Sequence, residues 1–244
     1  MKVELNPCYI LHHRSYRETS LILDVFSREY GRLALVAKGA KRQKNSSRYL
    51  LQPNQKLNIA WSIRGDMGTL TAVEREGEAT NLIDGWLLAA FYLNELIMRL
   101  LHKHESHPEL FDAYASAMDK FYSQEAEQST LRIFEKYLLQ SLGYGLVLDH
   151  DVVSGKAIDS NEDYYYQIDY GPMLNTPLVS DYVEITGRTL TALKQDKITD
   201  LSSLREAKRL MRGTLKKHLG NKPLASRELY KAYMKEREKP KVGS

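Results

Sequence analysis

Five short apolar runs within the first 80 residues predict β-strands. They cover residues 8–13, 20–26, 33–37, 57–63 and 69–73. The runs are rich in β-branched and aromatic residues, and turn signals such as Pro7, Arg28–Gly31 and Arg64–Gly68 bound them. Five strands with one long polar loop suit a small OB-type barrel. An SH3-like barrel fits the strand count nearly as well.

After residue 80 the apolar positions recur at helical spacing. The predicted helices cover residues 86–101, 107–122, 127–142, 189–195, 201–219 and 226–237. We expect Asp84 to be the N-cap of the first helix and Gly143 to follow the third as its C′ residue. The predicted fold class is therefore α+β. An N-terminal five-stranded OB-type β-barrel at residues 1–80 precedes a mainly α-helical domain at 81–244, with an irregular insertion at about 143–180 that contains short strands.

Composition and hydropathy favour a globular cytoplasmic protein. Hydrophobic residues make up 43% and charged residues 27% of the 244 residues, as in ordinary globular domains. The N-terminus lacks the apolar segment of a signal peptide. The most apolar run, Trp86–Leu101, contains charged residues and is shorter than the ~18 residues of a membrane span. Cys8 is the only cysteine, which excludes an internal disulfide and every zinc site that needs several cysteines.

Charge is unevenly distributed along the chain. Residues 1–48 carry a net charge of +6 and residues 201–244 a net charge of +9, whereas the residues between them carry −11. Two basic ends around an acidic middle suggest a polyanionic partner for the ends. The alternative is that both basic segments are merely solvated faces.

The segment 201–219 carries the sharpest local signal. At about 100° per residue, its apolar side chains form one stripe and its cations form a second stripe beside it. The candidate phosphate-binding residues of this helix are Arg205, Lys208, Arg209, Arg212, Lys216 and Lys217. Evenly spaced cations on one side of a helix can follow nucleic-acid phosphates. Glu206 is the only acid in the segment, and this scarcity favours phosphate binding over an ordinary solvated face.

A second basic segment lies in the predicted barrel, where the loop 38–48 contains no acid. The candidate nucleic-acid-binding residues of the barrel are Arg14, Arg17, Arg32, Lys38, Lys41, Arg42, Lys44 and Arg48. At the mouth of a small barrel, such a loop would attract the backbone of a nucleic acid. Candidate aromatic residues for base stacking are Tyr9, Tyr16, Tyr30, Tyr49 and Trp61, although most of them could equally be core residues.

Motifs for catalysis and metal binding are weak. Asp149–Asp151 could look catalytic, but no nucleophile can be identified beside it. Lys38–Lys41 lacks the glycine spacing of a phosphate-binding loop. His104 and His107 have i, i+3 spacing without a nearby cysteine. We therefore expect no catalytic residue, no cofactor and no metal site.

Several strings, in order along nearly the whole chain, resemble one family. They are Arg17–Leu23 (RETSLIL), Tyr30–Ala40 (YGRLALVAKGA), Leu51–Pro53 (LQP), Tyr92–Leu96 (YLNEL), Leu131–Glu135 (LRIFE), Leu142–Gly145 (LGYG) and Lys222–Leu229 (KPLASREL). No single string is decisive, but the ordered set is specific. It resembles the RecO family of DNA repair proteins, most closely its gammaproteobacterial branch.

The resemblance implies an OB-fold followed by a helical domain, in a non-enzymatic recombination mediator that uses no nucleotide. Such a protein would be cytoplasmic and nucleoid-associated. It would bind single- and double-stranded DNA and anneal complementary strands. With its partner RecR it would help RecA displace single-stranded DNA-binding protein. It would have no membrane partner.

In one respect the chain departs from part of this family. Some members carry a four-cysteine zinc site in the region that corresponds to about 145–180. This chain has no cysteine in that region. We therefore expect packing and hydrogen bonds, such as those of Tyr164–Tyr166, to hold the insertion together.

The resemblance also implies a docking site for the C-terminal tail of single-stranded DNA-binding protein, which is acidic and ends in an apolar residue. We expect the helix 127–142 to provide it, with Leu131 and Leu138 in an apolar stripe and Arg132 as the partner of the terminal carboxylate. The alternative is that Arg132 is an ordinary arginine paired with Glu135 of the same helix.

Two functions of other classes stay open. The first is an OB-fold enzyme acting on nucleic acid, such as a nuclease or modifier, which would need a clustered carboxylate metal site. The second is an RNA-binding module, which a competition between DNA and RNA of the same sequence would identify.

Overall fold

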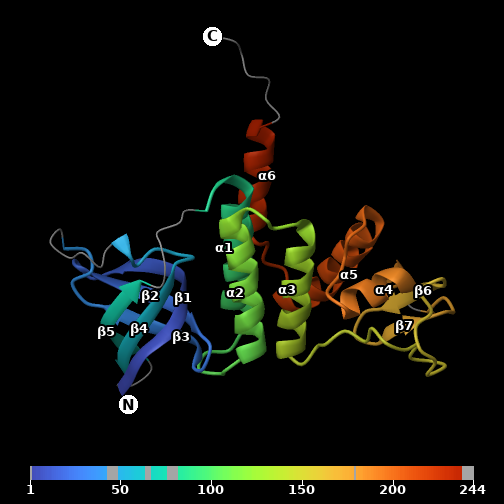
Figure 1. Cartoon of the computed structure of the whole chain (residues 1–244), viewed down its shortest axis with the longest axis horizontal. Helices are drawn as coiled ribbons and strands as arrows, with labels where there is room; N and C mark the ends of the chain where they lie inside the picture. Colours follow the sequence, from blue (N-terminus) through green and yellow to red (C-terminus); the bar gives the residue numbers. More distant parts are fainter. Residues whose placement is uncertain (1, 43–48, 64–66, 76–81, 179, 238–244) are drawn as a thin grey trace, which may run out of the picture. The chain divides into compact units, whose positions relative to one another are not determined.

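The computed structural model describes residues 2–42, 49–63, 67–75, 82–178 and 180–237. By the packing of its backbone the chain forms two compact units, one of residues 1–124 and 223–244 and the other of residues 125–222 (Figure 1). The boundary predicted at residue 80 marks the change from strands to helices, and a domain division at that position stays a prediction.

The first unit begins with a closed five-stranded barrel. Its strands are β1 (Lys2–Tyr16), β2 (Ser20–Ser27), β3 (Gly31–Ala37), β4 (Lys56–Ile63) and β5 (Gly68–Arg75). The order around the barrel is β1-β2-β3-β5-β4, with β3 and β5 parallel and every other pair antiparallel. This order is that of an OB-type barrel, which confirms the predicted fold class. Ile10, Leu23, Leu35 and Trp61 are fully buried in its core.

The first strand is longer than the sequence pattern predicts. Pro7 was expected to bound it, but β1 begins at Lys2 and Pro7 is paired with Asn58 of β4. The register of this ladder shifts between Val3 and Asn6, immediately before the proline. Proline has no N–H for a ladder, and such irregularities are where strands tolerate it. The predicted boundary was therefore wrong.

Three helices belong to the same unit: α1 (Asp84–Leu100), α2 (Pro108–Ser123) and α6 (Ala225–Arg237). Aromatic rings join α2 to the barrel, with the centroids of Phe26 and Phe111 5.3 Å apart and those of Tyr9 and Tyr114 5.0 Å apart. Ile83 occupies the N-cap position of α1, so Asp84 is the first helical residue and the predicted cap at Asp84 was wrong. With Asp84 as its N-cap, α1 would begin at residue 85, so the helix begins one residue earlier than this cap predicted.

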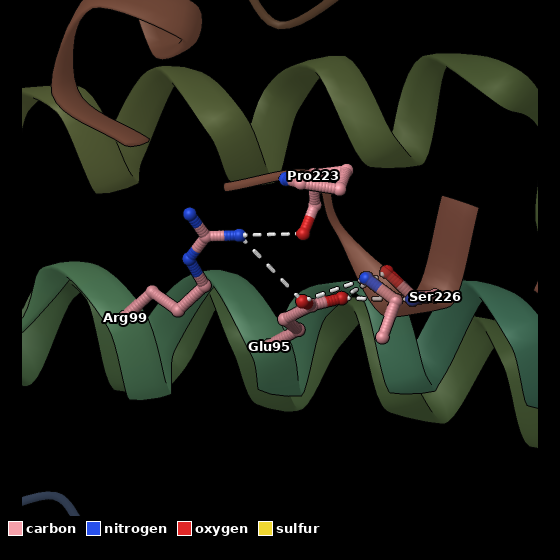
Figure 2. Close-up of polar contacts among 5 residues, drawn as sticks. Glu95, Arg99, Pro223 and Ser226 are labelled. Carbon is pink, nitrogen blue, oxygen red and sulfur yellow. Dashed lines mark hydrogen bonds and ion pairs between the residues drawn. The ribbon is translucent and has the colours of Figure 1, made fainter. Parts of the chain in front are cut away.

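The helix α6 begins beside α1, where a carboxylate of α1 takes the place of a side-chain cap (Figure 2). Glu95 accepts hydrogen bonds from the backbone N–H groups of Ala225 and Ser226, both at 2.9 Å, and from the Ser226 hydroxyl at 2.6 Å. Arg99 forms an ion pair with Glu95 at 3.7 Å and donates a hydrogen bond to the carbonyl of Pro223 at 3.2 Å. The first turn of α6 is thereby fixed to α1.

The second unit combines helices with a small sheet. Its helices are α3 (Gln128–Ser141), α4 (Gly187–Lys194) and α5 (Leu201–Leu219). Its strands are β6 (Asp163–Gln167), β7 (Gly171–Met173) and β8 (Tyr182–Thr186), in the antiparallel order β7-β6-β8. The apolar stripe of α5 faces the interior of this unit, with Ala207, Met211 and Leu215 buried as predicted. Gly143 follows α3 with a φ of 81°, which confirms its predicted C′ role.

Hydrogen bonds hold the insertion at 143–180 together, as expected for a region without cysteine. The Tyr166 hydroxyl accepts from the backbone N–H of Val147 at 3.0 Å, and the Tyr164 hydroxyl accepts from that of Asp159 at 2.9 Å. The Asp151 carboxylate adds a cross-link that the sequence did not reveal. It accepts from the backbone of Val153, Ser154 and Leu174, and so joins the loop after α3 to the end of β7.

Among the helices that the structure describes, none combines the length and the apolar character required to cross a membrane.

Candidate nucleic-acid interface

Five cations share the outer face of α5. Arg205, Lys208, Arg209, Arg212 and Lys216 are all exposed. Their positions fall within an arc of about 100° on the helix, on the side away from the buried stripe. Arg209 donates a hydrogen bond to the carbonyl of Glu184 at 3.1 Å. Within the part of the chain that the structure describes, none of the five forms an ion pair with a carboxylate. We call these five residues the α5 basic face.

The single acid of α5 points away from this face. Glu206 accepts hydrogen bonds from the backbone N–H and the hydroxyl of Thr186, both at 2.9 Å, and from the hydroxyl of Thr189 at 2.6 Å. Its carboxylate is therefore used to hold the start of α4. The α5 basic face keeps its full positive charge as a result.

Lys217, a predicted site residue, lies outside the α5 basic face. Its ammonium group is 2.6 Å from the carboxylate of Asp169 and 3.4 Å from that of Asp181. The hydrogen bond that Lys217 donates to Asp169 raises the pKa of Lys217 above its ordinary value. Lys217 stays a predicted DNA contact, but two carboxylates already share its charge.

The barrel carries a second basic site at one end, where the β1–β2 turn meets the end of β3. An open hollow of about 730 Å³ is lined there by three cations and one acid, Arg17, Lys38, Arg42 and Glu18, together with Tyr16 and the hydroxyl-bearing Thr19. The guanidinium of Arg17 lies 5.1 Å from the centroid of the Tyr16 ring. The hollow therefore combines cations with a partly exposed aromatic ring, the pair of features that single-stranded nucleic acids require. We call this site the barrel hollow.

The other predicted barrel cations differ in their surroundings. Arg14 and Lys41 are exposed. Arg32 is half-buried and donates a hydrogen bond to the carbonyl of Met98 near the end of α1. Burial lowers the pKa of Arg32 below its ordinary value. Arg32 therefore helps to attach the barrel to α1, and Lys44 and Arg48 lie outside the described residues.

Burial narrows the choice of aromatic residues for stacking. Tyr9 and Trp61 are buried in the core, and Tyr30 packs edge-on against Trp61 with ring centroids 5.1 Å apart. Tyr16 is partly exposed and Tyr49 is 76% exposed. Tyr49 is therefore the most exposed of the five candidates, whereas Tyr16 and Tyr30 are both partly buried.

The predicted tail-docking residues on α3 are less accessible than their spacing indicated. Leu138 is fully buried and Leu131 is partly exposed. The Arg132 side chain is 10% exposed and its guanidinium lies 2.9 Å from the carboxylate of Glu135, whose side chain is 1% exposed. The pairing that the sequence left open as an alternative is therefore present, and the role of Arg132 in partner binding stays a prediction.

The residues considered for catalysis or metal binding have the following surroundings. His150 is paired with Asp149 at 2.7 Å, and Cys8 is buried, which raises the pKa of its thiol to about 12. In the described ranges no group of three or more His, Cys, Asp or Glu side chains could hold a metal ion.

Comparison with known proteins identifies the family. Residues 1–76 match the model of the recombination protein O N-terminal domain, and residues 86–228 match that of the recombination protein O C-terminal domain. A DNA repair protein RecO of Nitrosococcus oceani is 44% identical over 229 residues, which are 94% of this chain and 93% of the relative. Relatives of the same name from Methylococcus capsulatus and Pasteurella multocida are 40% and 39% identical, covering 95% and 93% of this chain and 94% of each relative. The chain therefore belongs to the RecO family, which confirms the resemblance seen in its sequence motifs.

Proposed function

We propose that the protein is a DNA-binding recombination mediator, which anneals complementary strands and helps to load RecA onto single-stranded DNA covered by single-stranded DNA-binding protein. It does so in the cytoplasm as a non-enzymatic protein, without a nucleotide or a metal ion. Membership of the RecO family supports the role in DNA repair. The α5 basic face is the structural observation that best supports DNA binding.

The cations of the α5 basic face have no acid four residues before or after them on the helix. Solvated helix faces usually interleave cations with acids at i+4, because such pairs stabilise the helix. The α5 basic face has no such acid, so its cations repel one another until a polyanion is bound. Binding of phosphates releases condensed counterions from the DNA and provides most of the binding free energy. The barrel hollow offers a second site of the same sign, and two sites on one protein suit a protein that holds two strands.

Protein partners belong to the same proposal. RecR would work with this chain in loading RecA. The tail of single-stranded DNA-binding protein would dock on α3, where its carboxylate would have to replace Glu135 as the partner of Arg132. Leu131 is the more accessible of the two predicted leucines and would make the first apolar contact.

The salt dependence of DNA binding tests the α5 basic face. Replacing Arg205, Arg209, Arg212 and Lys216 with glutamine should weaken binding of single-stranded DNA. The slope of log K against log salt should become shallower by about three, since each phosphate contact contributes about 0.7 for single strands. Fluorescence anisotropy titrations at several salt concentrations measure both quantities.

A matched control removes the same charge elsewhere. Lys2, Lys103, Lys120 and Lys156 are exposed and lie outside both basic sites. Their replacement with glutamine should leave the slope nearly at its wild-type value. An unchanged slope in the α5 variant would refute DNA binding by this helix.

An annealing assay separates the proposed mediator from the alternatives. Complementary oligonucleotides are mixed with the protein in EDTA without nucleotide, and fluorescence resonance energy transfer reports their annealing. We expect annealing under these conditions, with both strands at full length afterwards. Shortened or modified strands would indicate an enzyme. Preferential competition by RNA of the same sequence would indicate an RNA-binding module.

A further inference from the structure

A second cavity lies in the first unit, on the helix side of the barrel and away from the barrel hollow. Its volume is about 350 Å³, near the lower limit of small-ligand pockets. The barrel contributes Tyr49, Gln55 and Arg75 to its lining, and α1 contributes Leu87 and Phe91. Tyr49 is 76% exposed, and Arg75, at the end of β5, is also exposed. A cavity of this size suits one ring system rather than a folded segment of protein.

The floor of this cavity is held by buried hydrogen bonds. Asn54 lines the cavity, and its side-chain carbonyl accepts from the Asn94 amide of α1 at 2.7 Å. The Tyr114 hydroxyl donates to the Asn94 carbonyl at 2.7 Å, and the Tyr122 hydroxyl donates to the backbone carbonyl of Asn54 at 2.7 Å. Burial raises the pKa of Tyr122 to about 12, so its hydroxyl remains a donor at neutral pH. These hydrogen bonds hold Asn54, in the loop that also carries Tyr49 and Gln55. The site is therefore formed before any ligand arrives.

The lining contains both apolar and polar residues. Leu82, Leu87 and Phe91 are apolar, whereas Gln52 and Gln55 carry polar side chains. A nucleobase has the matching character, because its two faces are apolar and its edge carries donors and acceptors. Arg75 at the cavity supplies the positive charge that the adjoining phosphate requires. An exposed aromatic ring beside such a cavity is the usual stacking surface for an unpaired base.

We propose that this cavity receives one unstacked base of single-stranded DNA, with the Tyr49 ring as its stacking surface and Arg75 as the partner of a neighbouring phosphate. The site deepens the proposed function and rests on it, because it needs a DNA strand bound to the same unit. It is distinct from the phosphate contacts of the α5 basic face, since it recognises the base. A strand held in this way exposes its remaining bases to a complementary strand.

The test compares two single strands with equal numbers of phosphates. One is a thymidine oligonucleotide of twelve residues, and the other is the same length with every base replaced by an abasic site. Counterion release is the same for both, so a difference in affinity reports on the bases. We expect the wild-type protein to bind the base-containing strand about tenfold more tightly in anisotropy titrations, equivalent to about 1.4 kcal/mol.

Variants assign this preference to the cavity. Tyr49→Ala should reduce the ratio of the two affinities to about one, whereas Tyr49→Phe should keep it because the ring remains. Leu87→Trp should also abolish the preference by filling the cavity, with the fold checked by circular dichroism. Tyr170→Ala is the matched control, since Tyr170 is 61% exposed and lies in the other unit. That variant should retain the wild-type ratio.

The outcomes separate the two proposals. Failure of the wild-type protein to bind either strand would refute the proposed DNA binding and this site with it. Equal affinity for the two strands, or a preference that survives in both Tyr49→Ala and Leu87→Trp, would refute the base site alone. The cavity would be a peptide site instead if two results were found together. An acidic peptide with an apolar C-terminal residue would bind the wild-type protein and lose affinity in both variants, and both variants would keep the wild-type preference for the base-containing strand.

Discussion

Cations that look equivalent in the sequence differ in what surrounds them. Arg32 donates to a carbonyl 66 residues away, and Lys217 is bound by a carboxylate 48 residues away. Arg205 and Arg212 have no carboxylate partner among the described residues. The sequence pattern could name all four as candidates because it shows charge and helical phase. It could not rank them, because the atoms that neutralise or bury a side chain come from distant parts of the chain.

Arg132 and Glu135 provide a test at the scale of single residues. Arg132→Ala leaves a carboxylate that is 1% exposed without its ion-pair partner at 2.9 Å. We expect this change to lower the free energy of unfolding by about 3 kcal/mol, because a buried charge keeps its desolvation penalty when its partner is removed. Urea denaturation followed by circular dichroism measures the difference.

Two variants serve as controls for this ion pair. Arg188→Ala removes an exposed arginine of α4 in the same unit and should change stability by less than about 0.5 kcal/mol. Arg132→Met combined with Glu135→Leu should recover most of the loss, since both charges are then absent. Wild-type stability in Arg132→Ala would show that the pair contributes little and that Arg132 is available to a partner.

At the scale of elements, periodicity predicted most of the fold. The five barrel strands and six helices all occur where they were predicted, because each has a clear apolar period. Their ends lie within about three residues of the predicted ones, except that β1 begins six residues earlier. The errors at Pro7 and Asp84 concern the ends of elements. The start of β1 is set by its pairing with β4, which lies more than 50 residues away in the sequence, and the start of α1 differs from the predicted one by a single residue. The capping of α6 by Glu95 could not be predicted from neighbouring residues, since Glu95 lies 130 residues before Ala225. The cavity lined by Tyr49, Arg75 and α1 could not be predicted for the same reason, because its lining comes from separate strands, loops and helices.

The attachment of α6 should depend on pH. Burial raises the pKa of Glu95, but the hydrogen bonds from Ser226 and Ala225 outweigh it and lower the pKa below the ordinary value of 4.5. A carboxyl whose pKa is depressed by folding stabilises the folded state above its unfolded pKa, and this contribution is lost as the pH falls through its folded pKa. Glu95→Gln should therefore destabilise α6 at pH 7 by about 1–2 kcal/mol. The difference from wild type should shrink as the pH falls below about 4.5.

Amide hydrogen exchange of residues 225–237, corrected for intrinsic rates, measures this local stability. Glu228→Gln is the control, because Glu228 lies on α6 itself and is paired with Lys231 of the same helix. It should leave protection nearly unchanged. Equal protection of α6 in wild type and Glu95→Gln at pH 7 would show that the carboxylate does not hold the helix.

At the scale of the whole molecule, the chain carries one basic site in each compact unit. The barrel hollow belongs to the unit of residues 1–124 and 223–244, and the α5 basic face belongs to that of residues 125–222. The sequence predicted both sites from the charge asymmetry between the ends and the middle. It did not predict that α6 returns to α1, which places the C-terminal segment in the same unit as the barrel.

This division leads to a prediction about annealing. Either site can hold a single strand through its phosphates, but an annealing protein must hold two strands at once. We therefore expect each single-site variant to retain strand binding. The variant with Arg17, Lys38 and Arg42 replaced by glutamine should bind a strand through the α5 basic face, and the α5 variant should bind one through the barrel hollow. The comparison is made at protein concentrations that saturate the single strands with each variant. Both variants should then anneal complementary oligonucleotides at least about tenfold more slowly than the wild type. The reason is that one strand lacks a binding site, so the repulsion between the two phosphate backbones is less compensated. Saturation removes the effect of affinity from this comparison, and the variant that lacks Lys2, Lys103, Lys120 and Lys156 provides the control for total charge. If either site alone supports wild-type annealing at saturation, the two units do not divide the strands between them, and the site that remains in that variant must hold both.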